Sequence, residues 1–175
     1  MIYLNNASTS YPKPNSVINA VNDYLSNIPV LAHRSGIDSE SEDIITQARK
    51  NLAKVLGTKH FDRIFFTPGS TFSLNMALKG LDFEGKHFIA TEIEHNAIVR
   101  PLETLKFQNL IEVDYAKADS KGFIEPNEIK RLIKNNTKAI FINHCSNVTG
   151  TLQDIKSISK ICKENSVLLI VDASQ

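Results

Sequence analysis

The feature that most constrains the fold of this chain is a regular alternation of short apolar runs with longer helix-compatible segments. The apolar runs predict strands over residues 63–67, 87–91, 110–114, 138–143 and 167–171. The segments between them predict helices over residues 70–81, 96–107, 126–134 and 152–164. This alternation predicts an α/β fold, a mostly parallel sheet flanked by helices. The last run, VLLIV, lacks polar alternation, which is typical of a strand covered on both faces.

The residues before this alternation predict an arm and a first helix. Pro12 and Pro14 disfavour an early helix, so we expect residues 1–15 to form an extended N-terminal arm. Apolar side chains at helical spacing then predict a helix over residues 15–27. Residues 29–36 break this pattern and predict a loop.

A second helix is predicted from apolar side chains at helical spacing, which are Ile44, Ile45, Ala48, Leu52 and Val55. The pair Asp38-Ser39, with Glu42 after it, resembles a capping box that would open this helix. Gly57 is placed to end it, because glycine readily adopts the left-handed conformation that follows many helices.

Composition excludes several classes of protein. Apolar residues make up 42% of the chain and charged residues 22%, which is typical of a soluble globular protein. The net charge of +1 argues against an extended nucleic-acid surface or a polybasic membrane patch. No apolar run approaches the roughly 20 residues that span a bilayer. Two cysteines make neither a disulfide framework nor a metal set, so we expect reduced thiols, no metal and a cytoplasmic location.

The segment from Thr67 to Thr71, TPGST, joins a predicted strand to a predicted helix. A turn of small residues exposes backbone N–H groups at a helix N-terminus, where the helix dipole favours an anion. The pattern is neither GxGxxG nor a Walker A motif, so it favours a single phosphate over a nucleotide. The alternative is an ordinary capped turn.

Three further polar segments follow three further predicted strands. In Glu94-His95-Asn96, a histidine could stack on a flat ring or move protons, or the segment could simply cap a helix. The polar run over 143–150 suggests ligand contacts, with a plain turn as the alternative. Asp172 follows a buried strand, where a carboxylate is costly unless it is paired, for example by a protonated pyridine nitrogen; alternatively it caps a helix. Because ligands bind at the carboxyl ends of strands in open α/β sheets, four such segments together indicate a site.

These segments resemble the class V aminotransferase group of fold-type-I pyridoxal-phosphate (PLP) enzymes, and within it the cysteine desulfurases and selenocysteine lyases. The resemblance is carried by residues 3–10, His33-Arg34, 67–75, 94–96, 146–150 and 171–175. Two positions depart from the family pattern. Asn5 stands where an aspartate is usual, and Phe72 stands where many relatives carry an acid.

The resemblance implies a set of cofactor-binding residues, of which the histidine is also catalytic: Gly69, Ser70, Thr71, His95, Asn147, Asp172 and Gln175. The turn that contains Ser70 and Thr71 would hold the cofactor phosphate. His95 would stack on the ring and relay protons, and Asp172 would pair with the ring nitrogen. Gln175 would donate to the ring hydroxyl, and Asn147 would lie near that hydroxyl and the substrate carboxylate.

The resemblance also implies an activity for the full-length protein. It would be a PLP-dependent cysteine desulfurase that converts L-cysteine to L-alanine and enzyme-bound sulfur, working as a homodimer with a possible sulfur-acceptor protein. Residues 16–175 would then be part of its PLP-binding large domain. The family's Schiff-base lysine and sulfur-accepting cysteine are expected after Gln175, so this chain alone is expected to be inactive. Cys145 and Cys162 do not match the position of that cysteine.

Three alternatives stay open at this point. The chain could belong to another class V enzyme, such as an aminotransferase, a kynureninase-like hydrolase or an epimerase. It could be a non-catalytic relative that keeps the fold. It could also be a generic phosphate- or nucleotide-binding α/β domain.

Overall fold

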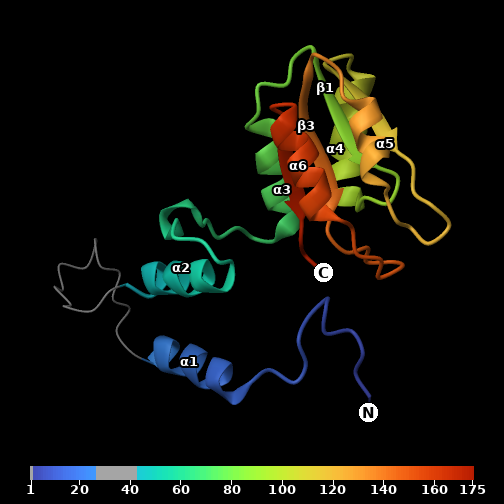
Figure 1. The fold of residues 1–175 in the computed structure, drawn as a ribbon. Helices are drawn as coiled ribbons and strands as arrows, with labels where there is room; N and C mark the ends of the chain where they lie inside the picture. The colour runs from blue at the N-terminus through green and yellow to red at the C-terminus, as the bar shows by residue number, and fades with distance from the viewer. Residues whose placement is uncertain (1, 27–42) are drawn as a thin grey trace. The chain divides into compact units, whose positions relative to one another are not determined.

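The structure is a computed structural model, which describes residues 2–26 and 43–175. The chain divides into two compact units, Met1–Phe66 and Thr67–Gln175. The second unit is a parallel sheet with helices on both faces, so the predicted fold class is confirmed (Figure 1). The proposed division into residues 1–15 and 16–175 stays a prediction.

The first unit contains two α-helices, α1 (Asn15–Ser26) and α2 (Ile44–Val55). Asp43 caps α2, because its carboxylate accepts hydrogen bonds from the backbone N–H groups of Ile45 and Thr46, each at 3.0 Å. Gly57, with φ of 66°, follows this helix as predicted. The expected capping residues 38–42, the loop over 29–36 and His33-Arg34 lie outside the described residues.

The strand predicted over residues 63–67 is wrong. A short 3-10 helix, η1 (Phe61–Arg63), occupies the start of this region. The side chains of Phe65 and Phe66 are 72% and 53% exposed. An apolar run becomes a strand only where a neighbouring strand accepts its backbone hydrogen bonds, and none of the described strands pairs with this segment.

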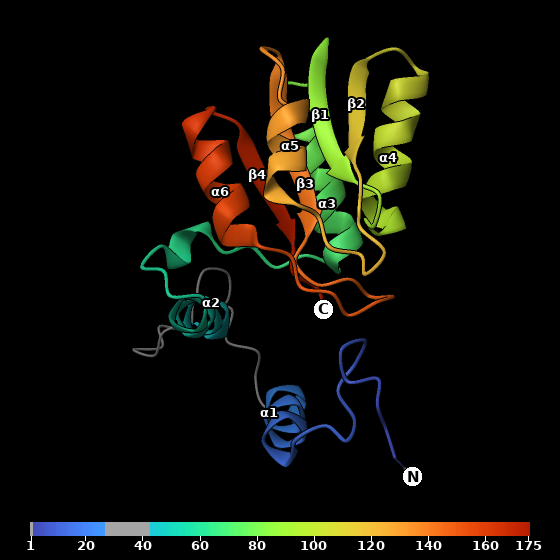
Figure 2. The same ribbon diagram turned by 45° about the vertical axis from the view of Figure 1, so that its right-hand side comes forward.

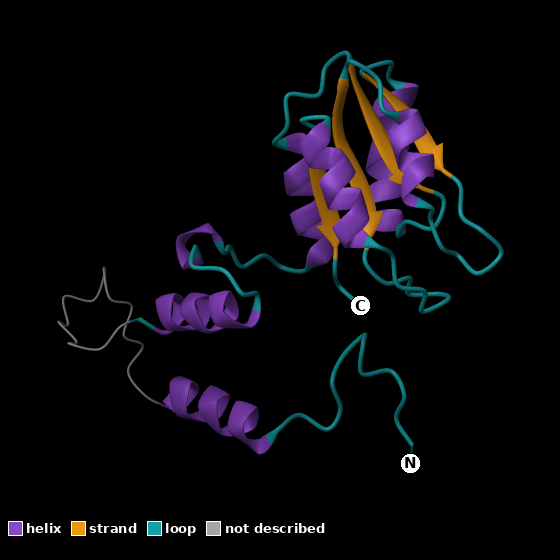
Figure 3. Ribbon diagram, viewed as in Figure 1, coloured by secondary structure: helices purple, strands orange, loops and turns teal. Residues whose placement is uncertain are grey.

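The second unit is built on a four-stranded parallel sheet with the strand order β2-β1-β3-β4 (Figure 2). The strands are β1 (Lys86–Thr91), β2 (Ile111–Ala116), β3 (Thr137–Asn143) and β4 (Leu168–Asp172). The helices are α3 (Ser70–Lys79), α4 (Asn96–Phe107), α5 (Pro126–Leu132) and α6 (Ile155–Glu164). Each agrees in type and approximate bounds with its prediction, and helices and strands alternate along the chain as the sequence indicates (Figure 3).

Two apolar layers hold this sheet. Helices α3 and α4 pack on one face of the sheet. There, Phe88 of β1 and Phe141 of β3 form one buried cluster with apolar side chains of the two helices. Helices α5 and α6 pack on the other face, against Ile89 of β1 and Ile140 of β3. The two faces therefore take alternate residues of each central strand, as the pleat requires.

The predicted full coverage of the last strand is wrong. β4 is an edge strand of the four, Leu168 is 49% exposed, and the remaining residues of the strand are only partly buried. The uninterrupted apolar run therefore identified a strand without identifying its place in the sheet. Within the described residues, no helix is both long and apolar enough to cross a membrane.

Candidate functional site

A small hollow of about 70 Å³ lies where β3 and β4 end, and loops and helix N-termini complete it. Its lining is Ser70, His95, Asn143, Cys145, Asn147, Asp172, Ser174 and Gln175. Five of the seven predicted site residues therefore share one hollow. The other two, Gly69 and Thr71, flank Ser70 in the chain without lining it. The convergence follows from the parallel sheet, since all strands end at the same edge.

The N-terminus of α3 presents unsatisfied backbone donors beside this hollow. Gly69 precedes the helix with φ of 120°, a conformation that favours glycine, and its carbonyl accepts the N–H groups of Phe72 and Ser73. The N–H groups of Ser70 and Thr71 have no backbone acceptor among the described residues. Such a helix end is a ready site for an anion.

The side chains of Thr67 and Ser73 shape this turn. Their hydroxyl oxygens lie 2.6 Å apart, and the Thr67 hydroxyl also donates to the Gly69 carbonyl at 3.1 Å. These hydrogen bonds tie Thr67, which precedes the turn, to the first turn of α3. Phe72, the residue that departs from the family pattern, is 52% exposed.

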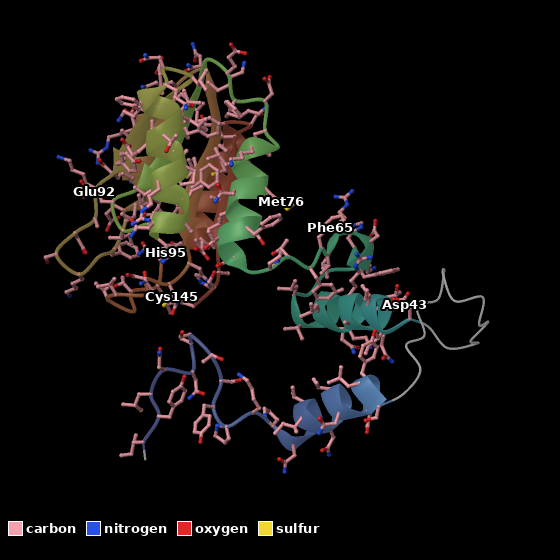
Figure 4. The ribbon with its side chains drawn as sticks, turned by 180° about the vertical axis from the view of Figure 1, so that it is seen from behind. Asp43, Phe65, Met76, Glu92, His95 and Cys145 are labelled. Carbon is pink, nitrogen blue, oxygen red and sulfur yellow. The ribbon has the colours of Figure 1, made fainter. Side chains whose placement is uncertain are left out.

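His95 is the N-cap of α4, so the sequence alternative of a capping histidine describes part of its role. Its Nδ1 accepts the backbone N–H of Ala97 at 3.1 Å. An Nδ1 that accepts carries no proton, so in the neutral ring the proton sits on Nε2. The cap holds the ring in place and leaves Nε2 available at the hollow. Figure 4 shows His95 and Cys145 at the same end of the sheet.

Asn147 lies in a tight turn between β3 and α6. The buried Ser146 hydroxyl accepts the backbone N–H groups of Val148 and Thr149, each at 3.2 Å, and Gly150 closes the turn onto the Ser146 carbonyl. The alternative of an ordinary polar turn is thus correct for part of this segment. The same turn holds the exposed Asn147 side chain at the hollow.

Asp172 is the last residue of β4 and caps no helix in the described chain. Its Oδ1 accepts the backbone N–H of Ser174 at 3.0 Å and also the Ser174 hydroxyl. No ion pair to Asp172 is found among the described residues. One carboxylate oxygen is therefore committed to the local turn, and the other is left for a donor in the hollow.

Two neighbouring groups had no individual role in the sequence analysis. Asn143, the last residue of β3, lines the hollow while 96% buried, since its relative exposure is 4%. Glu94 lies behind it and accepts hydrogen bonds from the Thr91 hydroxyl at 2.5 Å and from the Asn143 backbone N–H at 3.0 Å. Burial, with a smaller contribution from the charge of Asp172, raises the pKa of Glu94 to about 7.

The sequence carried only a weak signal for these two residues. Both stand inside polar segments at strand ends, but nothing local distinguishes Asn143 from its neighbours. The pairing of Asn143 with Asp172 in the β3–β4 ladder is what brings it into the site.

A comparison with known protein families identifies the family of this chain. Residues 2–175 match the family model described as aminotransferase class-V, and the chain belongs to that family. The resemblance inferred from the motifs is thereby confirmed at the family level.

Several curated proteins are similar in sequence to nearly the whole chain. The chain is 36% identical to a cysteine desulfurase IscS of Dictyoglomus turgidum, over 99% of this chain and 45% of that protein. It is 35% identical to the cysteine desulfurase IscS of Methanosarcina thermophila, over 99% of this chain and 44% of that protein. The chain thus spans somewhat under half the length of these curated relatives.

Two solved structures have a similar fold over nearly the whole chain. A NifS-like protein matches with a TM-score of 0.83 and 29% identity, over 98% of this chain and 48% of that chain. A structure described as SspA in complex with cysteine matches with a TM-score of 0.81 and 27% identity, over 99% of this chain and 50% of that chain. The chain is therefore similar in sequence to proteins named cysteine desulfurase, and similar in fold to these two solved structures.

Proposed function

We propose that the complete protein is a PLP-dependent cysteine desulfurase, which takes the sulfur of L-cysteine and releases L-alanine. The observation that carries the proposal is the convergence of Ser70, His95, Asn147, Asp172 and Gln175 on one hollow, although they come from four separate segments. The family and the names of the relatives favour this chemistry over an aminotransferase, a hydrolase or an epimerase on the same scaffold.

The donors and acceptors around the hollow fit a phosphorylated pyridine. The free N–H groups at the start of α3 and the Ser70 hydroxyl suit an anionic phosphate. Asp172, without a cationic partner in the described chain, suits a protonated ring nitrogen. At about 70 Å³ the hollow is too small to enclose a phosphorylated pyridine, so the whole cofactor would extend beyond it.

Each residue then has a definite task. Ser70 and Thr71, with the turn at Gly69, would hold the phosphate. Asp172 would keep the ring nitrogen protonated, because its carboxylate favours the charged form of a neighbouring base. When bound, PLP supplies an electron sink for charge that develops on the substrate.

The remaining polar residues would orient the ring and the substrate. His95 would lie against the ring, and its Nε2, the protonated atom of the neutral side chain, is where a proton could be given or taken. Asn147 and Gln175 offer amide N–H donors that suit the ring hydroxyl and, for Asn147, the substrate carboxylate. A homodimer, a sulfur-acceptor protein, a cytoplasmic location and the inactivity of residues 1–175 alone stay predictions.

The cofactor assignment is tested with Asp172→Asn in the complete protein. The asparagine keeps an oxygen for the Ser174 N–H but removes the charge. We expect the affinity for pyridoxine 5′-phosphate, which lacks the reactive aldehyde, to fall about tenfold or more by calorimetry, with alanine release from cysteine falling as well. Asp154→Asn is the matched control, because Asp154 similarly accepts a nearby backbone N–H at the start of α6 and is not part of the hollow. Unchanged affinity and activity in Asp172→Asn would refute the assignment.

A further inference from the structure

One buried polar atom at the edge of the hollow is left without a partner. The side-chain oxygen of Asn143, Oδ1, has no hydrogen-bond donor among the described residues and is closed off from bulk water. The residue as a whole is only 4% exposed, yet it lines the hollow. A buried amide oxygen without a donor is unfavourable, so its presence in a well-packed strand end calls for a donor from elsewhere.

The orientation of this amide is set by its other atom. Asn143 Nδ2 donates to the carbonyl oxygen of Ile93 at 2.6 Å. Rotating the amide by half a turn would place Oδ1 against that carbonyl, where two acceptors would face each other. The backbone N–H of Asn143 is likewise committed, to the carboxylate of Glu94. Oδ1 is therefore the one group of this residue left to receive a donor.

Asn143 and Asp172 present their side chains to the same face of the sheet. They are partners in the parallel ladder between β3 and β4, and the N–H of the next residue, His144, donates to the Asp172 carbonyl at 2.8 Å. Residues paired in register share a face, and here it is the face covered by α3 and α4. Asn143 and Asp172 are thus neighbours on one face of the sheet and both line the hollow, and their amide and carboxylate together suit a cationic N–H group.

We propose that Asn143 is an additional cofactor-binding residue, whose Oδ1 accepts part of the hydrogen bond from the protonated ring nitrogen that Asp172 pairs with. This inference rests on the proposed function. The amide would help to keep the ring nitrogen protonated, and binding would satisfy the orphaned oxygen. Asn143 would also position His95, because its bonds to Ile93 and Glu94 fix the segment that leads to that histidine.

The competing explanation is a purely structural role for Asn143. Two ligands that differ only at the ring nitrogen distinguish this role from cofactor binding. In the complete protein, Asn143→Ala and the wild type are each titrated with pyridoxine 5′-phosphate and with its analogue in which a carbon replaces the ring nitrogen. Asn165→Ala is the matched control, because the Asn165 amide also donates to a backbone carbonyl, that of Ile161 at 2.8 Å, but at the end of α6. Circular dichroism and thermal unfolding verify that each variant is folded.

The proposal expects Asn143→Ala to bind pyridoxine 5′-phosphate about tenfold more weakly and the carbon analogue almost as well as the wild type does. It also expects the ring nitrogen of the bound ligand to lose its proton at a lower pH in Asn143→Ala than in the wild type, which the absorbance of the ring measures. An equal loss for both ligands would overturn the proposal in favour of a structural role. No loss for either ligand would overturn it by showing that Asn143 does not contribute to binding. If the wild type binds neither ligand, the proposed function itself has failed. If Asn143→Ala does not fold, Asn143→Ser, which keeps a hydroxyl donor for Ile93, is titrated with the same two ligands.

Discussion

The carboxylate of Glu94 accepts the backbone N–H of Asn143 at 3.0 Å, and this bond joins the segment after β1 to the end of β3. The same carboxylate accepts the Thr91 hydroxyl. Both donors favour the ionised acid, yet burial outweighs them and raises its pKa to about 7. A group that supports the site thus changes its charge near neutral pH.

Glu94→Gln should make the protein more stable in mild alkali and leave it nearly unchanged in acid. The folded pKa of about 7 exceeds the ordinary value of 4.5, so the folded state binds the extra proton between these values. The contribution of Glu94 to stability is therefore fully present below pH 4.5 and is lost as the pH rises through 7. By urea unfolding, the variant should match the wild type at pH 5 and exceed it by on the order of 2 kcal/mol at pH 8.

The control for this prediction is Glu92→Gln, the exposed neighbour two residues earlier (Figure 4). It should change the free energy of unfolding by less than about 0.5 kcal/mol at both pH values. An equal stabilisation by both substitutions would show that general surface charge, and not the buried Glu94 carboxyl, is responsible.

His87 should contribute the opposite pH dependence. It is fully buried on β1, with Nδ1 2.8 Å from the Thr137 hydroxyl and Nε2 3.2 Å from the Asp114 carboxylate. Burial, followed by the charge of Lys134, lowers the pKa of His87 below its ordinary 6.5, although Asp114 opposes this shift. The unfolded chain then binds the proton more readily, so stability is lost as the pH falls below 6.5.

The measurement is the free energy of unfolding at several pH values between 5 and 7, made in the Glu94→Gln background to remove the opposing slope. His87→Gln should flatten the loss of stability toward acid, whereas His144→Gln, at an exposed histidine, should not. If both variants keep the full slope of the parent, His87 is not the group that takes up the proton.

Gln153→Ala should destabilise the second unit by about 2–4 kcal/mol. The Gln153 side chain is buried, accepts the Ile124 N–H at 2.9 Å and donates to the Gly122 carbonyl at 2.8 Å. Removing it leaves two backbone groups without partners. Chemical denaturation measures the loss, and Gln108→Ala, at an exposed glutamine after α4, should change stability by less than about 0.5 kcal/mol. Similar small effects for both would contradict this role.

Ligand binding should protect Cys145 from alkylation. Cys145 lines the hollow and is only partly buried, whereas Cys162, a residue of α6, is buried in the core. Saturating pyridoxine 5′-phosphate should slow the reaction of Cys145 with iodoacetamide about tenfold or more, as followed by mass spectrometry. Cys162 serves as an internal control that stays unreacted while the protein is folded. Unaltered labelling of Cys145 would place the ligand elsewhere.

The second unit could be predicted largely from local patterns. Helices α3 to α6 and strands β1 to β4 follow from periodicity, from Pro126 at a helix start and from turn residues between them. The segment at 63–67 was mispredicted for a reason that applies generally, since an apolar run records a tendency toward burial but not the presence of a strand to pair with.

The sequence by itself determined the alternating α/β fold, the family and the polar residues that follow each strand, because periodicity and short motifs are local properties of the chain. Only the tertiary structure decided which of those residues share a hollow. Segments far apart in sequence create the register that pairs Asn143 with Asp172. They also bury the amide oxygen that has no donor and the Glu94 carboxyl whose pKa is raised. Such contacts cannot be predicted from a local sequence pattern, because the packing of the whole sheet fixes each of them.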